Sequence, residues 1–84
     1  MTFKKGSKVK LKTFLGELTA KKRTDPINDY WKIIGQRGEI IDDDFYNERI
    51  LVLFENDLDQ FGVANHNPII NSLWILPKDL ELDN

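Results

Sequence analysis

The side chains that could carry out chemistry are few, and they do not form a catalytic set. His66 is the only histidine, it lies in a turn-like Asn-His-Asn-Pro sequence, and the chain has no cysteine. Ser7 and Ser72 occur in no pattern that supplies a base and an orienting acid, as nucleophilic catalysis requires. A zinc site without cysteine would need carboxylates for its other ligands. We therefore expect no catalytic residue, no metal and no cofactor, and we expect the protein not to be an enzyme.

Carboxylates dominate the second half of the chain, beginning with Asp42, Asp43 and Asp44. These three residues are consecutive, whereas calcium loops place their ligands at alternate positions and use a glycine at the sharp bend. The triplet is more typical of a solvated turn, and Glu48 follows in a second turn-compatible stretch. Such a dense group of negative charges would attract a basic partner.

A second group of carboxylates alternates along the sequence at Glu55, Asp57 and Asp59. In extended backbone, alternate residues project to the same side. The spacing therefore fits an acidic docking surface, and it fits equally a loop that keeps the chain in solution.

The charges are distributed unevenly along the chain. Residues 1–39 contain ten basic and four acidic groups, whereas residues 40–84 contain two basic and ten acidic groups. Such asymmetry indicates an electrostatic partner, unless strands from the two halves interleave in space. The basic run at residues 21–23 and the lysines of residues 8–12 could bind nucleic acid. The isoelectric point of 5.3, however, is far below the value above about 9 that is typical of a basic binding domain.

The length of 84 residues predicts one domain over residues 1–84, with a thin core that depends on large aromatic side chains. The absence of cysteine is compatible with a reducing compartment. We find no apolar stretch typical of a secretory signal peptide or of a membrane span. The cytoplasm is therefore the expected location.

Apolar alternation and turn residues predict strands over 8–12, 38–41, 49–54, 72–76 and 80–82. The third is almost wholly apolar, so we expect it to be central and covered on both faces. The pattern predicts a mainly β fold. Phe54 should belong to the core, and the following residues should be largely buried: Val9, Leu11, Ile40, Leu51, Leu53 and Trp74.

The segment between the first two predicted strands is unusually long for a small domain. Loops of such length are usually functional or contain structure of their own. Apolar residues around Trp31 should hold residues 13–35 against the core. Trp31 could instead be exposed as an anchor in a protein interface, where aromatic residues are enriched.

Four segments together resemble a small bacterial SH3-like barrel: 6–11, 35–41, 50–54 and 73–82. This resemblance implies a closed or nearly closed barrel of about five strands. The short chain, acidic at one end and without catalytic residues, is also similar in style to compact bacterial immunity proteins that neutralise toxins. A fold of this kind hosts many activities, so the function depends on the site.

The combined observations favour a protein-binding inhibitor of the immunity or antitoxin type. An acidic surface would cover a basic partner, such as the active site of a nuclease, and aromatic contacts would slow its release. The expected partner-binding residues are Asp42, Asp43, Asp44, Glu48, Glu55, Asp57, Asp59 and Trp31. The alternative is a nucleic-acid- or ribosome-associated SH3-like module that uses the basic first half of the chain.

Overall fold

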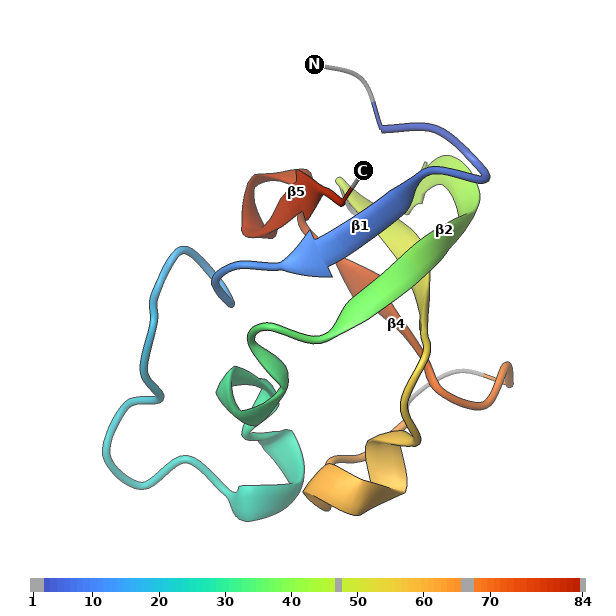
Figure 1. Cartoon of the computed structure of the whole chain (residues 1–84). Coiled ribbons are helices and arrows are strands. Elements are labelled where there is room, and N and C mark those ends of the chain that lie inside the picture. The colour runs from blue at the N-terminus through green and yellow to red at the C-terminus, as the bar shows by residue number, and fades with distance from the viewer. Residues whose placement is uncertain (1–2, 47, 66–67, 84) are drawn as a thin grey trace.

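Five antiparallel strands and four short 3-10 helices make up the computed structural model, which describes residues 3–46, 48–65 and 68–83 (Figure 1). The strands are β1 (Lys8–Leu11), β2 (Arg37–Tyr46), β3 (Arg49–Phe54), β4 (Ser72–Ile75) and β5 (Leu80–Leu82). The 3-10 helices are η1 (Pro26–Asn28), η2 (Tyr30–Ile33), η3 (Leu58–Phe61) and η4 (Pro77–Asp79). The predicted mainly β class is confirmed, and the arrangement is compatible with an SH3-like fold.

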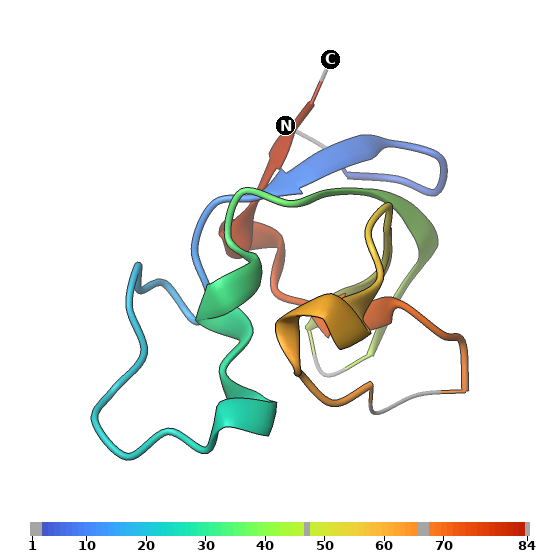
Figure 2. The same ribbon diagram turned by 60° about the horizontal axis from the view of Figure 1, so that its bottom comes forward.

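The strands form one sheet in the order β4-β3-β2-β1-β5. The N-terminal strand β1 pairs with the C-terminal strand β5, so the two ends of the chain meet in the sheet. The sheet curls, and the pair formed by β1 and β2 crosses in front of β4 in Figure 1. The long segment after β1 and the segment around η3 both extend to the same side of the curled sheet (Figures 1 and 2).

Strand alternation divides the sheet into an inner face and an outer face. Val9, Leu11, Ile40 and Val52 point into the core and are fully buried. Phe54 is also buried, as predicted, and it pairs with Gly38 at the start of β2. The alternating pattern of the sequence therefore identified most of the core correctly.

Two of the residues predicted to be buried lie on the outer face. The prediction was wrong for Leu53, which is 37% exposed because its neighbours Val52 and Phe54 take the inner positions. Trp74 is only partly buried, since it pairs with Leu51 on the outer face. The expectation that the apolar run in β3 is covered on both faces therefore holds at Leu51 but fails at Leu53.

The second strand is much longer than predicted. Asp42, Asp43 and Asp44 lie within β2 and do not form the predicted turn. The ladder with β3 has irregularities between Ile40 and Asp42 and again between Asp42 and Tyr46. Such bulges insert extra residues into one strand and increase its bend. Pairing with β3 therefore overrides the local preference of aspartate for turns.

The long segment between β1 and β2 is confirmed, and it contains η1 and η2. Phe14, Tyr30 and Ile33 from this segment are buried. The Tyr30 hydroxyl donates a hydrogen bond of 2.7 Å to the carbonyl of Ala64, which ties the segment to the loop after η3. Within the described part of the chain, no helix has the length and apolar character needed to cross a membrane.

Candidate functional site

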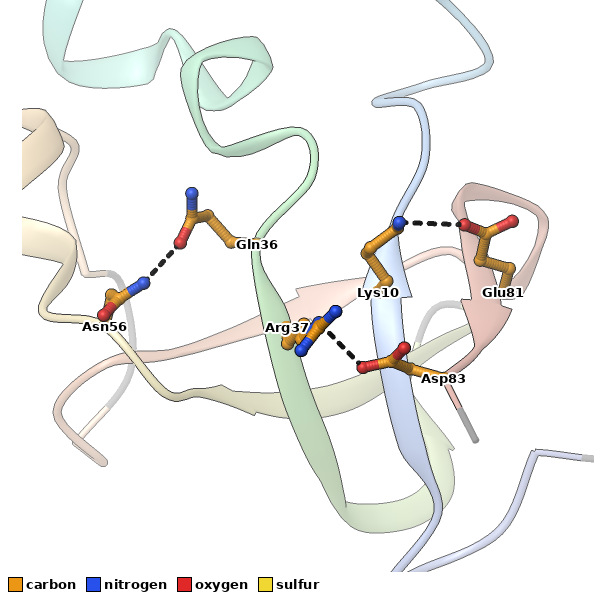
Figure 3. A network of polar contacts seen from close by, with 6 residues as sticks. All are labelled: Lys10, Gln36, Arg37, Asn56, Glu81 and Asp83. Carbon is orange, nitrogen blue, oxygen red and sulfur yellow. Dashed lines mark hydrogen bonds and ion pairs between the residues drawn. The ribbon is translucent and has the colours of Figure 1, made fainter.

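Ion pairs across strands cover one region of the outer face. Lys10 pairs with Glu81 at 3.8 Å between their Nζ and Oε1 atoms. Arg37 pairs with Asp83 at 3.0 Å between Nε and Oδ2 (Figure 3). Both pairs join a basic group from the first half of the sequence to an acidic group from the second half. The charge asymmetry of the sequence is therefore partly cancelled in space, where β1 and β2 lie beside the C-terminal residues.

Lys8 forms a third pair on this face, with Glu39 of the neighbouring strand β2. The hydrogen bond to the Glu39 carboxylate, together with its negative charge, raises the pKa of Lys8, and the more distant Glu55 adds to this effect. Both partners of the pair are well exposed to solvent, so it contributes little to stability. It does, however, place a carboxylate beside the Lys8 ammonium group, where a phosphate would have to compete with it.

The next strands along the outer face carry apolar side chains. Leu51 pairs with Trp74, and Leu53 pairs with Ser72. Trp74 leaves part of its side chain accessible, and Leu53 is more than one third exposed. An exposed apolar position thus lies in β3, beside the charged rows of β1 and β2. Apolar positions with a charged border are typical of protein interfaces.

Three exposed carboxylates follow directly after β3, and we call Glu55, Asp57 and Asp59 the acidic segment. They do not share one continuous extended stretch, because the chain bends at Glu55 and enters η3 at Leu58, so that only Asp57 has an extended backbone. None of the three forms an ion pair with a residue that the structure describes. The segment therefore presents its negative charges to solvent.

Hydrogen bonds hold the backbone of the acidic segment against the sheet. The Glu55 amide donates to the Arg37 carbonyl at 3.0 Å, and the Leu58 amide donates to the Asn71 side chain at 3.0 Å. Between them, Asn56 donates from Nδ2 to Gln36 Oε1 at 2.6 Å (Figure 3). The carboxylates are thus mounted on a fixed backbone, which lowers the entropic cost of binding.

The remaining predicted acidic residues lie at the other end of β3. Asp42 and Asp43 are partly buried in β2, and the Asp43 carboxylate accepts a hydrogen bond of 2.9 Å from the Lys5 amide. Asp44 belongs to the same strand, and Glu48 is exposed in the turn that leads to β3.

The predicted acidic surface is therefore divided into two groups. The ladder of β2 and β3 has Gly38 opposite Phe54 at one end and Tyr46 opposite Arg49 at the other. The acidic segment lies beyond Phe54, and Glu48 lies beyond Arg49. A strand of six residues is about 17 Å long at the usual rise per residue. Of the predicted acidic residues whose burial the structure describes, Glu55, Asp57 and Asp59 are exposed within one short segment, whereas Asp42 and Asp43 are partly buried.

Trp31 packs against the core and is partly buried. Its ring meets that of Phe14 edge to face, with the ring centroids 4.9 Å apart. The indole Nε1 is buried and has no hydrogen-bond partner in the described part of the chain. The ring therefore packs against the core with its polar atom turned away from solvent, and contact of its accessible part with a partner stays a prediction.

The polar residues considered for catalysis lie apart or have structural partners. Ser72 is fully buried, and its hydroxyl donates to the Ile69 carbonyl at 2.6 Å. The Ser7 hydroxyl accepts a bond of 3.3 Å from the Lys4 amide. His66 lies outside the described residues. Among residues 3–46, 48–65 and 68–83, no group of three potential metal ligands occurs.

One polar residue of the structure was missed by sequence reasoning. Asp79 is fully buried, and its carboxylate binds the turn that follows β1. The sequence around it, Pro-Lys-Asp, indicated only a tight turn. No periodic signal distinguishes a buried turn aspartate from an exposed one.

Comparison with protein-family models, with curated proteins and with solved structures finds no match for this chain.

Proposed function

We propose that this chain is a protein-binding inhibitor of the toxin-immunity type, which acts in the cytoplasm of a bacterium. Its acidic segment would cover a basic surface of an enzyme, such as the substrate cleft of a nuclease. The observation that supports this proposal is that Glu55, Asp57 and Asp59 are exposed on a hydrogen-bonded backbone and form no ion pair with a described residue.

The mechanism is occlusion assisted by electrostatic attraction. Complementary charge speeds the encounter of two proteins and selects against partners of the same charge. Leu53 lies two residues before the acidic segment and is exposed on the outer face. Its burial in the complex would add apolar contact, which slows dissociation. Glu48 and the three aspartates of β2 would contribute only to the long-range field, because they lie farther along the β2–β3 ladder, toward Arg49.

Nucleic-acid binding through the outer face receives less support. Lys8, Lys10 and Arg37 each have a carboxylate partner on a neighbouring strand or terminus. A phosphate would have to displace that carboxylate and would meet its negative charge. Binding of this kind depends on free cations that replace the counterions of the nucleic acid.

The experiment compares two charge-reversed variants of equal size. One variant changes each residue of the acidic segment to lysine, and the control changes the basic run Lys21, Lys22 and Arg23 to glutamate. Each protein is immobilised and exposed to extract of the source cells, and retained proteins are identified by mass spectrometry. The activity of a retained enzyme is then measured with each variant added.

We expect a basic enzyme that is retained and inhibited by the wild type and by the control, but not by the acidic-segment variant. Gel-shift assays with RNA and DNA are run on the same proteins. Loss of nucleic-acid binding in the control variant, with no effect of the acidic-segment variant on any partner, would contradict the proposal.

A further inference from the structure

The turn after β1 has an unusual backbone for its sequence. Phe14 and Glu17 are joined by two backbone hydrogen bonds, of 2.9 and 3.0 Å, so Leu15 and Gly16 form a two-residue hairpin turn. Both central residues are left-handed, with φ of 53° for Leu15 and 78° for Gly16. Such turns favour glycine, asparagine or aspartate, because a larger side chain is strained there. Leu15 therefore adopts a backbone conformation that is unfavourable for a leucine.

The carboxylate of Asp79 holds this turn in place. It accepts hydrogen bonds from the Thr13 hydroxyl at 2.6 Å and from the amides of Leu15 and Gly16 at 2.9 Å each. The Asp79 carbonyl also accepts a bond of 2.8 Å from the Lys12 amide. We call residues 13–17 the pinned turn. A strained residue persists only where the surrounding structure fixes it, and such positions are frequent at binding sites.

The left-handed backbone of Leu15 does not place its side chain in the core. Its side chain is 43% exposed, whereas the neighbouring Phe14 is buried. Leu18, just beyond the turn, is 70% exposed. The pinned turn therefore holds one apolar side chain, that of Leu15, partly exposed to solvent.

The surroundings of the pinned turn are basic. Residues 12–24 contain four basic groups and one acidic group, Glu17. Lys78 lies beside the turn, since its Nζ is 3.6 Å from the position that a Cβ on Gly16 would occupy. Neither Lys12 nor Lys78 forms an ion pair with a described residue. Leu15 thus lies in a turn that Lys12 precedes and that Lys78 adjoins, and such an arrangement is complementary to an apolar pocket with an acidic border.

We infer that the pinned turn is a second protein-binding surface, at which Leu15 enters an apolar pocket of an acidic partner. This surface is separate from the acidic segment and goes beyond the proposed function, because its partner has the opposite charge. A fixed backbone favours a protein pocket of defined shape over a lipid surface, since insertion into a membrane requires no particular turn geometry. Phe14 is buried, so the turn offers no aromatic platform for stacking of bases.

The test uses a displayed library of random short peptides, selected on the immobilised chain. We expect the selected peptides to combine a large apolar residue with flanking aspartate or glutamate. The Leu15→Asn variant removes the apolar side chain but tolerates the left-handed backbone. It should lose about tenfold or more in affinity for these peptides, while its melting temperature stays equal or rises.

Two controls accompany this variant. Ile70→Asn changes another aliphatic side chain, which is 75% exposed in a different loop, and it should leave peptide affinity unchanged. The acidic-segment variant should bind the peptides at least as tightly as the wild type, since it gains positive charge, so failure of this inference and failure of the proposed function are distinguishable. Lys78→Glu should weaken binding, and the wild-type affinity should fall as salt concentration rises.

Several outcomes would overturn the inference. These are failure to select acidic peptides, equal affinity of wild type and Leu15→Asn, and a lowered melting temperature of that variant. Vesicles of phosphatidylcholine with phosphatidylserine, single-stranded oligothymidylate, and the chain itself at rising concentration are tested in parallel. A Leu15-dependent interaction with any of these would assign the turn to a lipid surface, to nucleic acid or to self-association instead.

Discussion

The carboxylate of Asp79 and the backbone amide of Leu15 are joined by a hydrogen bond of 2.9 Å across 64 positions of the sequence. Thr13 and Gly16 donate to the same carboxylate. A fully buried carboxylate has lost its water, so these three donors replace the hydration that it has in the unfolded chain. The bond ties η4 to the turn after β1.

We expect Asp79→Ala to lower the free energy of unfolding by about 1–3 kcal/mol or more, because two amides of the pinned turn lose their acceptor. Asp57→Ala removes an exposed carboxylate and should change stability by less than about 0.5 kcal/mol. Urea unfolding of both variants measures the difference. Equal stability of the two variants would show that the Asp79 bonds do not hold the turn.

Phe54 and Trp74 should differ in their importance for stability. Phe54 is 3% exposed in the core, so Phe54→Ala should cost about 3–5 kcal/mol. Trp74 is only partly buried on the outer face, and Trp74→Ala should remain below about 3 kcal/mol. Thermal and chemical unfolding of the two variants provide the comparison. A larger loss for Trp74→Ala would place the main core on the other face of the sheet.

Gly38 lies where the backbones of β2 and β3 approach closely. A Cβ at this position would stand 2.6 Å from the Leu53 carbonyl oxygen and 2.8 Å from Val52 Cγ1. Gly38→Ala should therefore destabilise the fold by about 1–3 kcal/mol through overpacking. Adding Val52→Ala should not restore stability, since the nearest atom belongs to the backbone. Wild-type stability of Gly38→Ala in urea would contradict this explanation.

Stability should fall at alkaline pH through Tyr30. Burial raises the pKa of the Tyr30 hydroxyl above its ordinary value of 10.0. The folded state therefore keeps the proton to higher pH than the unfolded state. The contribution of Tyr30 is fully present below the unfolded pKa and is lost as pH rises through the folded pKa.

The Tyr30→Phe variant isolates this effect, although it also removes the bond to Ala64. The difference in free energy of unfolding between wild type and Tyr30→Phe should be constant near neutral pH. Above about pH 10, where the unfolded tyrosine ionises, the wild type should lose stability relative to the variant. A difference that does not change with pH would exclude Tyr30 as the source of alkaline destabilisation.

Association with a basic partner should respond differently to the two acidic groups. Reversal of Glu55, Asp57 and Asp59 to lysine should slow association and remove most of its salt dependence. Glu48→Lys should have a smaller effect, because Glu48 lies at the far end of β3. Stopped-flow association rates over a series of salt concentrations measure both. Equal effects per charge would indicate that only net charge matters and that position does not.

Most of the strands could be located from local sequence patterns. Alternation in 8–11 and the apolar run in 49–54 are local signals, because a strand exposes alternate residues to opposite faces. The end of β2 could not be predicted in this way. Asp42, Asp43 and Asp44 favour turns when considered alone, but the ladder with β3 continues past them through two irregularities.

Residues of the same type differ in burial and hydrogen bonding, and these differences follow from the tertiary structure. Leu51 and Leu53 are two positions apart and lie on the same face of β3, yet Leu51 is 4% exposed and Leu53 is 37% exposed. Asp79 is the last residue of η4 and Asp57 directly precedes η3, yet Asp79 binds a distant turn and Asp57 faces solvent. Burial and pairing depend on chain segments that lie far apart in sequence, and no local pattern of side chains encodes that proximity.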